Sequence, residues 1–155
     1  MVSISHAISE DAEGILALQK LAYQSEAALY NDWSIPPLTQ TIESLREEFQ
    51  YLVMLKATVN ERIVGSVRAK IVGDTCGVGR LIVHPEFQGK GIGSRLLQTI
   101  ERSCNNVATF ELFTGSKSEN NIRLYQRAGY RITRTQSLSP TVSITFLEKS
   151  ADAAR

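Results

Sequence analysis

Residues 78–97 (VGRLIVHPEFQGKGIGSRLL) join an apolar run, a glycine-rich turn and an amphipathic stretch, and no other segment constrains the fold as much. The run Leu81-Ile82-Val83 is typical of a buried strand, and Pro85 ends it because proline has no N–H to give to a neighbouring strand. Beyond the turn, apolar residues recur at helical spacing from Ile92 onward. The sequence therefore predicts a strand, a tight turn and a helix in direct succession.

The turn itself, residues 88–94 (QGKGIGS), has the composition of an anion-binding loop. Its three glycines let the backbone turn tightly and let a ligand approach the main-chain amides closely. These amides lie at the start of a helix, where unpaired N–H groups and the helix dipole favour negative charge. Lys90 adds a positive charge to the loop. We therefore predict a cradle for a phosphate or pyrophosphate group.

Two common phosphate-binding patterns do not fit this turn. A P-loop requires Ser or Thr after its Gly-Lys pair, but Gly91 follows Lys90 here. The dinucleotide pattern G-x-G-x-x-G does not fit either. Its last position is Ser94 when it starts at Gly89 and Leu96 when it starts at Gly91, and neither is glycine. The pattern Q/R-x-x-G-x-G/A is filled, by Gln88, Gly91 and Gly93.

Together with its flanking strand and helix, this last pattern resembles the acetyl-CoA loop of the GNAT superfamily of N-acetyltransferases. A second segment, residues 121–130 (NIRLYQRAGY), resembles the A-x-x-L-Y-x-x-x-G-F/Y segment of the same family. The specific resemblance covers residues 78–130, and the first half of the chain is compatible with the family without being diagnostic. The resemblance implies acetyl-CoA as the acetyl donor and an unidentified amine as the acceptor.

The resemblance also assigns residues to the donor. In the family, the strand before the loop presents main-chain groups to the pantetheine arm, and an N–H there polarises the thioester carbonyl. Many members carry a pantetheine-binding asparagine seven residues before the tyrosine of the A-x-x-L-Y segment, which is Tyr125 here. In this sequence Ser118 holds that place and Asn121 lies four residues before the tyrosine, so either side chain could make the contact. The residues expected to bind acetyl-CoA are Leu81, Ile82, Val83, Gln88, Gly89, Lys90, Gly91, Ile92, Gly93, Ser94 and Asn121.

Tyr125 and Glu111 are the candidate catalytic residues. Tyr125 matches the family's usual general acid, and a phenol of pKa ~10 can protonate a departing thiolate; the alternative is a helix tyrosine that packs on the sheet. Glu111 lies within an expected strand and could deprotonate the amine, but it could equally form a buried ion pair with Arg80 that has no chemical role. His84 or a chain of waters are further candidates for the base.

The acceptor amine is expected where the first two helices and the loop between them cover the sheet. Tyr30, Asp32 and Trp33 lie in that loop region. Asp32 could attract a cation and Trp33 could stack on one, although both could also serve only to pack the loop.

The whole chain predicts a GNAT-like α/β fold with a mixed, mostly antiparallel sheet flanked by helices, in the order β-α-α-β-β-β-α-β-α-β-β. We expect a single N-acetyltransferase domain over residues 1–148 and a C-terminal tail over residues 149–155. The expected strands are 2–8, 52–59, 63–72, 78–84, 107–114, 130–135 and 142–146. The expected helices are 9–26, one that starts near 39, one that starts at 92, and 118–128, with a loop at 29–38.

Composition narrows the partners. The 155 residues carry a net charge of +1 with no block of like charges, which disfavours a nucleic-acid or membrane surface as partner. The first residues lack the apolar stretch of a signal peptide, and Cys76 and Cys104 give neither a metal spacing nor a disulfide framework. We therefore expect a cytoplasmic protein without a metal, and we leave a homodimer open.

Two functional hypotheses follow. The first is an N-acetyltransferase that moves the acetyl group of acetyl-CoA to a primary amine by direct attack in a ternary complex. The second is a catalytically silent acyl-CoA-binding sensor module. Tyr125 favours the enzyme, whereas the open identity of the base keeps the sensor as an alternative.

Overall fold

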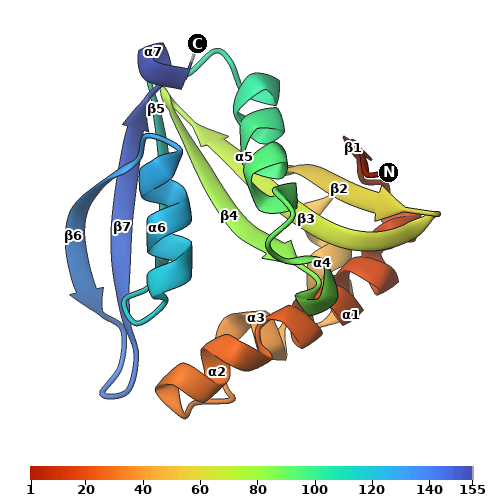
Figure 1. Cartoon of the computed structure of the whole chain (residues 1–155), viewed down its shortest axis with the longest axis horizontal. Coiled ribbons are helices and arrows are strands. Elements are labelled where there is room, and N and C mark those ends of the chain that lie inside the picture. The colour runs from red at the N-terminus through yellow and green to blue at the C-terminus, as the bar shows by residue number, and fades with distance from the viewer. Residues whose placement is uncertain (155) are drawn as a thin grey trace.

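The computed structural model describes residues 1–154, and its seven strands form one sheet with the order β1-β2-β3-β4-β5-β7-β6 (Figure 1). Neighbouring strands are antiparallel except β4 and β5, which are parallel. The strands are β1 (Ser3–His6), β2 (Val53–Val59), β3 (Arg62–Val72), β4 (Thr75–Val83), β5 (Thr109–Gly115), β6 (Arg131–Ser137) and β7 (Ser143–Ser150). The predicted fold class is confirmed.

Helices cover both faces of this sheet, which gives the protein two cores. They are α1 (Ala12–Ala22), α2 (Gln24–Tyr30), α3 (Pro36–Thr39), α4 (Ile42–Glu48), α5 (Ile92–Ser103), α6 (Glu119–Arg127) and α7 (Ala151–Ala154), with 3₁₀ turns η1 (Ser9–Asp11) and η2 (Pro85–Phe87). On β2, Met54 packs in a cluster with α1 and α4, while Leu55 packs in the larger cluster that contains α5. Successive strand side chains point to opposite faces, so these clusters lie on opposite sides of the sheet.

The amphipathic helix predicted after the glycine-rich turn is α5. Its apolar face is almost fully buried, with exposed fractions of 2% or less at Ile92, Leu96, Leu97 and Ile100. Full burial of such a side chain contributes roughly 1.5–3 kcal/mol. This face therefore fixes α5 across β3 and β4 and holds the preceding turn beyond the C-terminal end of β4.

The first predicted helix, 9–26, is divided in the structure. The 3₁₀ turn η1 comes first. The N–H of Ile8, the residue before this turn, donates a hydrogen bond to Asp11 Oδ2 over 2.9 Å. The helix then breaks at Tyr23 and resumes as α2, which continues to Tyr30. In Figure 1, α2 continues from α1 along the bottom of the view, below the lower ends of β4 and α6.

The expected loop at 29–38 is also more ordered than its two prolines suggested. Pro36 and Pro37 open the short helix α3, where the missing proline N–H is not needed. The next helix, α4, starts at Ile42 rather than near residue 39, because Thr41 caps it by accepting a hydrogen bond from the Ser44 N–H over 3.1 Å.

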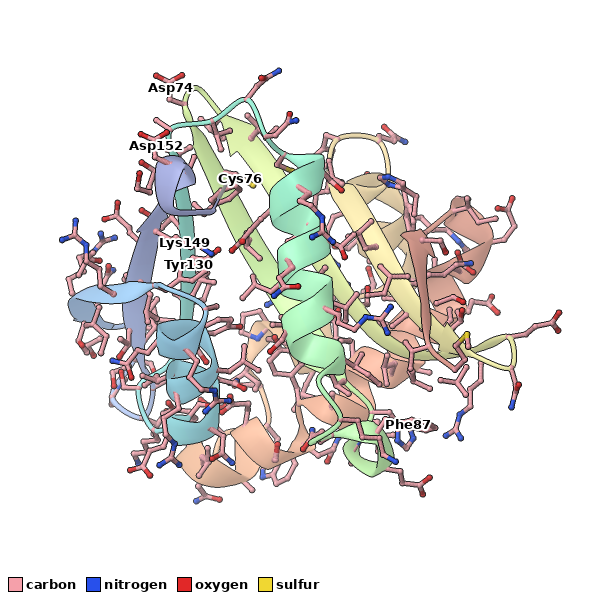
Figure 2. The ribbon with its side chains drawn as sticks, turned by 45° about the horizontal axis from the view of Figure 1, so that its top comes forward. Asp74, Cys76, Phe87, Tyr130, Lys149 and Asp152 are labelled. Atoms are coloured by element: carbon pink, nitrogen blue, oxygen red, sulfur yellow. The ribbon has the colours of Figure 1, made fainter. Side chains whose placement is uncertain are left out.

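The C-terminal segment is part of the fold through residue 151. Strand β7 continues to Ser150, and Ala151 is only 2% exposed, whereas a tail was expected from 149. Lys149 forms a buried ion pair with Glu101 of α5 (Nζ to Oε1, 3.1 Å), and Tyr130 donates to Glu101 Oε2 over 2.7 Å. Figure 2 shows Lys149 and Tyr130 in the space between α5 and the C-terminal strands. This cluster ties the two halves of the sheet together.

Candidate active site

The sheet opens between β4 and β5. These parallel strands pair only over Thr75–Gly77 and Thr109–Glu111, and beyond that point they diverge (Figure 1). A bulge in β4 adds to the opening, because Arg80 has a left-handed φ of 51° and the register with β3 shifts around it. The main chain at the end of β4 therefore has no strand partner on its β5 side within residues 1–154.

The glycine-rich turn adopts the geometry of an anion cradle. Gly91 is the N-cap of α5 with φ 81°, and Gly89 has φ 76°, a left-handed conformation that favours glycine. A Cβ added at either position would meet nothing within 4 Å, so the space above both is open. Gln88 secures the turn by donating from Nε2 to the Val83 carbonyl over 3.2 Å. The first N–H groups of α5 thus face an open space.

A cavity of about 860 Å³ extends from this turn to α2 and α6. It contains all of the predicted donor-binding residues except Lys90, whose side chain is exposed and does not line it. Lys117 lines it, and so do two basic residues of α6 that the sequence analysis also missed, Arg123 and Arg127. Their spacing of one helical turn places them on one face, and that spacing was the signal that could have identified them.

Asn121 and Ser118, the two candidates for the pantetheine contact, both line the cavity. Asn121 Nδ2 lies 3.2 Å from Glu26 Oε1 and 3.4 Å from Thr114 Oγ1. Ser118 is 8% exposed at the N-cap of α6, and its side chain makes no capping hydrogen bond. The geometry therefore leaves both contacts open.

Tyr125 is not among the residues that line the cavity; it is 6% exposed and packs edge-on against Tyr130 in the core, with ring centroids 6.1 Å apart. Burial raises the pKa of Tyr125, and Tyr23 and Glu26 nearby raise it further. The phenol therefore stays protonated over the physiological pH range. Among the described residues, none is a hydrogen-bond partner for its hydroxyl.

Glu111 lies away from the cavity. On β5, Phe110, Leu112 and Thr114 are buried toward the cavity side, whereas Glu111 alternates to the other face and is opposite Glu148 of β7. The alternative role for Glu111, an ion pair with Arg80, is not among the ion pairs of the described chain. The base role of Glu111 stays a prediction that this position does not favour.

His84, the other candidate base, is engaged at both ring nitrogens. Nε2 lies 2.9 Å from the Arg62 guanidinium, and Nδ1 accepts a hydrogen bond from the Glu86 N–H over 3.1 Å. His84 does not line the cavity. Its ring therefore serves to hold the η2 turn.

Two glutamates line the cavity, the exposed Glu119 of α6 and the partly buried Glu26 of α2. Burial raises the pKa of Glu26, and a hydrogen bond from Ser118 offsets part of the rise. One helical turn earlier, Tyr23 lines the cavity too, and Arg80 beside it partly counters the increase in the pKa of Tyr23 that burial causes. The sequence analysis assigned Glu26 only to the end of a helix, because nothing local distinguishes it from a solvent-exposed glutamate.

The expected acceptor residues around the α2–α3 loop take different places. Tyr30 is 6% exposed, and its hydroxyl accepts a hydrogen bond from the Lys117 N–H over 2.7 Å, which fixes α2 against the β5–α6 loop. The Asp32 carboxylate accepts hydrogen bonds from Ser34 and from Thr141. Trp33 is 53% exposed and does not line the cavity. Tyr30 therefore positions α2, and Asp32 connects this loop to the β6–β7 turn.

Two further features of the described chain bear on its partners. No helix within residues 1–154 is long and apolar enough to cross a membrane. In the same part of the chain, no cluster of three or more His, Cys, Asp or Glu side chains is arranged to hold a metal ion. Cys76 and Cys104 are both buried as free thiols.

Comparison with known proteins places this geometry in a family. The model of the acetyltransferase (GNAT) family matches residues 15–130. The UPF0157 protein YqkA of Bacillus subtilis is 25% identical over 132 residues, which are 85% of this chain and 38% of that protein. The chain thus spans well under half the length of this curated relative.

Solved structures share the fold at low identity. The PaiA N-acetyltransferase from Thermoplasma acidophilum, in complex with coenzyme A, superposes with a TM-score of 0.80 at 18% identity, over 97% of this chain and 99% of that one. The putative acetyltransferase yncA from Salmonella typhimurium, with acetyl-CoA, gives a TM-score of 0.76 at 20% identity, over 97% and 94%. Likeness at this identity establishes the fold.

Proposed function

The chain belongs to the GNAT family of acetyltransferases, and from that premise we propose that it transfers the acetyl group of acetyl-CoA to a primary amine by direct attack in a ternary complex. The observation that carries the proposal is the cavity at the opening between β4 and β5. It joins the glycine-rich turn at one end to the carboxylate of Glu26 at the other, and Tyr125 is buried close enough to Glu26 for that carboxylate to raise its pKa. Donor and acceptor can therefore occupy one space together.

The cavity has the chemistry that acetyl-CoA requires. The helix N-terminus at Gly91 and the cations of Arg123 and Arg127 match the negative charge of its phosphates. The main chain of Leu81–Val83, which has no strand partner on its β5 side, offers donors to the amides of a pantetheine arm and to a thioester carbonyl. Two proteins of the same fold have been solved with coenzyme A or acetyl-CoA. When bound, acetyl-CoA supplies an acetyl group that is activated as a thioester.

Each step of the proposed reaction is then assigned to particular residues of the chain. A main-chain N–H in Leu81–Val83 stabilises negative charge on the carbonyl oxygen. Tyr125, kept protonated by burial, donates to the sulfur as the thiolate departs. Asn121 or Ser118 orients the pantetheine arm. The helix α2, held by Tyr30 and Lys117, forms the wall on the acceptor side.

A screen of primary amines with acetyl-CoA, followed by release of free thiol, tests this proposal. We expect at least one amine class to give saturable turnover. The competing function is an acyl-CoA-binding sensor, since the cavity could hold the donor without any chemistry. Saturable acetyl-CoA binding with no thiol release from any amine would favour the sensor.

The variant Gly91→Asp tests the cradle. It places a carboxylate at the N-terminus of α5, where we expect the pyrophosphate to lie, and like charges 4 Å apart near a protein surface repel by about 4 kcal/mol. We expect acetyl-CoA affinity to fall at least ~10-fold below that of Gly91→Asn, as 1.4 kcal/mol corresponds to tenfold. Isothermal titration calorimetry measures the difference.

Gly91→Asn is the matched control because asparagine has nearly the same shape, carries no charge and tolerates a left-handed φ. An acidic residue at a helix N-terminus is favourable in the free protein, so Gly91→Asp should remain folded. Equal affinities for the two variants would show that no phosphate lies at this turn.

A further inference from the structure

We propose that Glu26 is the general base of this site: it binds the acceptor as an ammonium ion and takes its first proton, so the site selects primary amines that are cationic in solution. This inference rests on the acetyl transfer proposed above and adds the residue that recognises and activates the acceptor. It assigns the role of base to a residue of α2 that lines the cavity, in place of Glu111 on β5.

The position of the Glu26 carboxylate is the first argument. Its two oxygens differ: the donors to the carboxylate are Ser118 and Asn121, whose Nδ2 lies 3.2 Å from Oε1, while Oε2 is buried and has no hydrogen-bond partner among the described residues. A buried acceptor without a partner costs about 1–3 kcal/mol, and that cost is removed when a donor arrives. An ammonium group from the cavity would supply that donor.

The second argument compares the carboxylates around the cavity. Glu119 also lines it, but it lies in the exposed first turn of α6, where water competes for any cation. Glu111 lies on the other face of β5. Within the described residues, Glu26 alone combines access to the cavity with partial burial, and an ion pair gains strength where solvent is excluded.

The third argument is the charge that surrounds Glu26. Tyr23 and Tyr30 lie one turn away on either side, and Tyr125 of α6 is close enough for Glu26 to raise its pKa. Arg80 of β4 faces Tyr23, and Lys117 lies over the Tyr30 ring. No described cation forms an ion pair with Glu26. The carboxylate is therefore free to pair with a cationic ligand.

Burial raises the pKa of Glu26, which makes it a better proton acceptor than an exposed glutamate. The proton balance is complete without another reactant. Glu26 takes one proton from the ammonium and returns it to solvent, and the freed nitrogen lone pair forms the C–N bond as the C–S bond breaks. Tyr125 gives a proton to the thiolate and is restored, through solvent, by the second proton that leaves the nitrogen. The net products are an amide, free thiol and one proton.

The test is the pH dependence of kcat/KM for Glu26→Gln with a primary amine. Glutamine keeps the shape and the Asn121 contact but cannot accept the proton. We expect a loss of roughly 10²–10⁴-fold at neutral pH. The loss should shrink as pH rises, because only the free amine then reacts and its fraction grows about tenfold per pH unit below the amine pKa. The wild type should lose activity only as pH falls through the raised pKa of Glu26.

A second readout does not depend on turnover. A carboxyl whose pKa is raised by folding stabilises the fold below its unfolded pKa, and this contribution is lost as pH rises through the folded pKa. The melting temperature of Glu26→Gln should therefore equal or exceed that of the wild type at neutral pH. A purely structural Glu26 would give a lower melting temperature instead.

Two companion variants complete the experiment. Glu47→Gln removes the same charge from an exposed position of α4, so its profile should match the wild type. Glu111→Gln tests the competing base. If Glu111→Gln shows the pH-dependent loss and Glu26→Gln follows the wild type, Glu26 is not the base although acetyl transfer stands. If the wild type turns over no amine, the acetyl transfer and the base assignment both fail.

Discussion

Tyr125→Phe should lower kcat by roughly 10²–10⁴-fold, the usual contribution of a general acid, with little change in the affinity for acetyl-CoA. The thiolate forms only as the reaction proceeds, so the hydroxyl acts on the transition state and the loss appears in kcat. The ring, which packs against Tyr130 in the core, remains in place. Steady-state kinetics on an amine that the wild type acetylates, with binding measured by calorimetry, separates these effects.

Tyr125→Phe should remove the hydroxyl without destabilising the fold. Because the Tyr125 hydroxyl has no described hydrogen-bond partner, its removal leaves no buried polar group unpaired, and the melting temperature should hardly change. Tyr51→Phe, at a side chain that is 59% exposed, is the matched control and should behave as the wild type. Full kcat in Tyr125→Phe would mean that Tyr125 only packs and that the thiolate is protonated from solvent.

Glu101→Ala should destabilise the fold by about 3–5 kcal/mol, because it leaves the buried Lys149 ammonium without its counterion. The Lys149 and Glu101 side chains are only 9% and 6% exposed, and Tyr130 also loses the acceptor of its 2.7 Å hydrogen bond. The cluster joins α5 to the strands on the far side of the β4–β5 opening. Urea unfolding followed by circular dichroism measures the change in free energy.

Two controls identify the cause of this loss. Glu13→Ala breaks the ion pair with Arg46, whose side chains are 82% and 50% exposed, and should cost at most about 1 kcal/mol. The triple variant Glu101→Leu, Lys149→Met, Tyr130→Phe removes every polar atom of the cluster and should recover most of the stability, since apolar replacements of buried ion pairs are often neutral. A Glu101→Ala protein as stable as the wild type would show that solvent reaches Lys149.

The sheet and its helices could be predicted from sequence because their signals are local. Pro85 ends β4, Gly91 permits the left-handed start of α5, and Gly129, with φ 100°, follows the end of α6. The apolar residues of α5 repeat at helical spacing and are the ones that are buried. Each of these choices depends on the conformations open to a residue and its near neighbours.

The same local reasoning failed at the N-terminal helices. A continuous helical pattern concealed the break at Tyr23, and the prolines of residues 29–38 suggested a loop where α3 begins. Both outcomes depend on how α2 and α3 pack: Tyr30 reaches the Lys117 N–H, and Gln19 Nε2 donates to the Pro37 carbonyl over 2.8 Å. Such contacts between distant segments override local propensity.

By itself, the sequence determined the order of the strands and the glycine-rich turn that begins α5, because these depend on backbone conformations and periodicities within a few residues. The phosphate cradle and the role of Tyr125 stay predictions from the same local patterns. Only the tertiary structure decided which carboxylate enters the site. Strand register turns Glu111 to the other face of β5, since neighbouring side chains on a strand alternate. Packing of α2 brings Glu26 to within 3.2 Å of Asn121, 95 positions along the chain. Burial and register depend on the whole fold, and no local pattern encodes them.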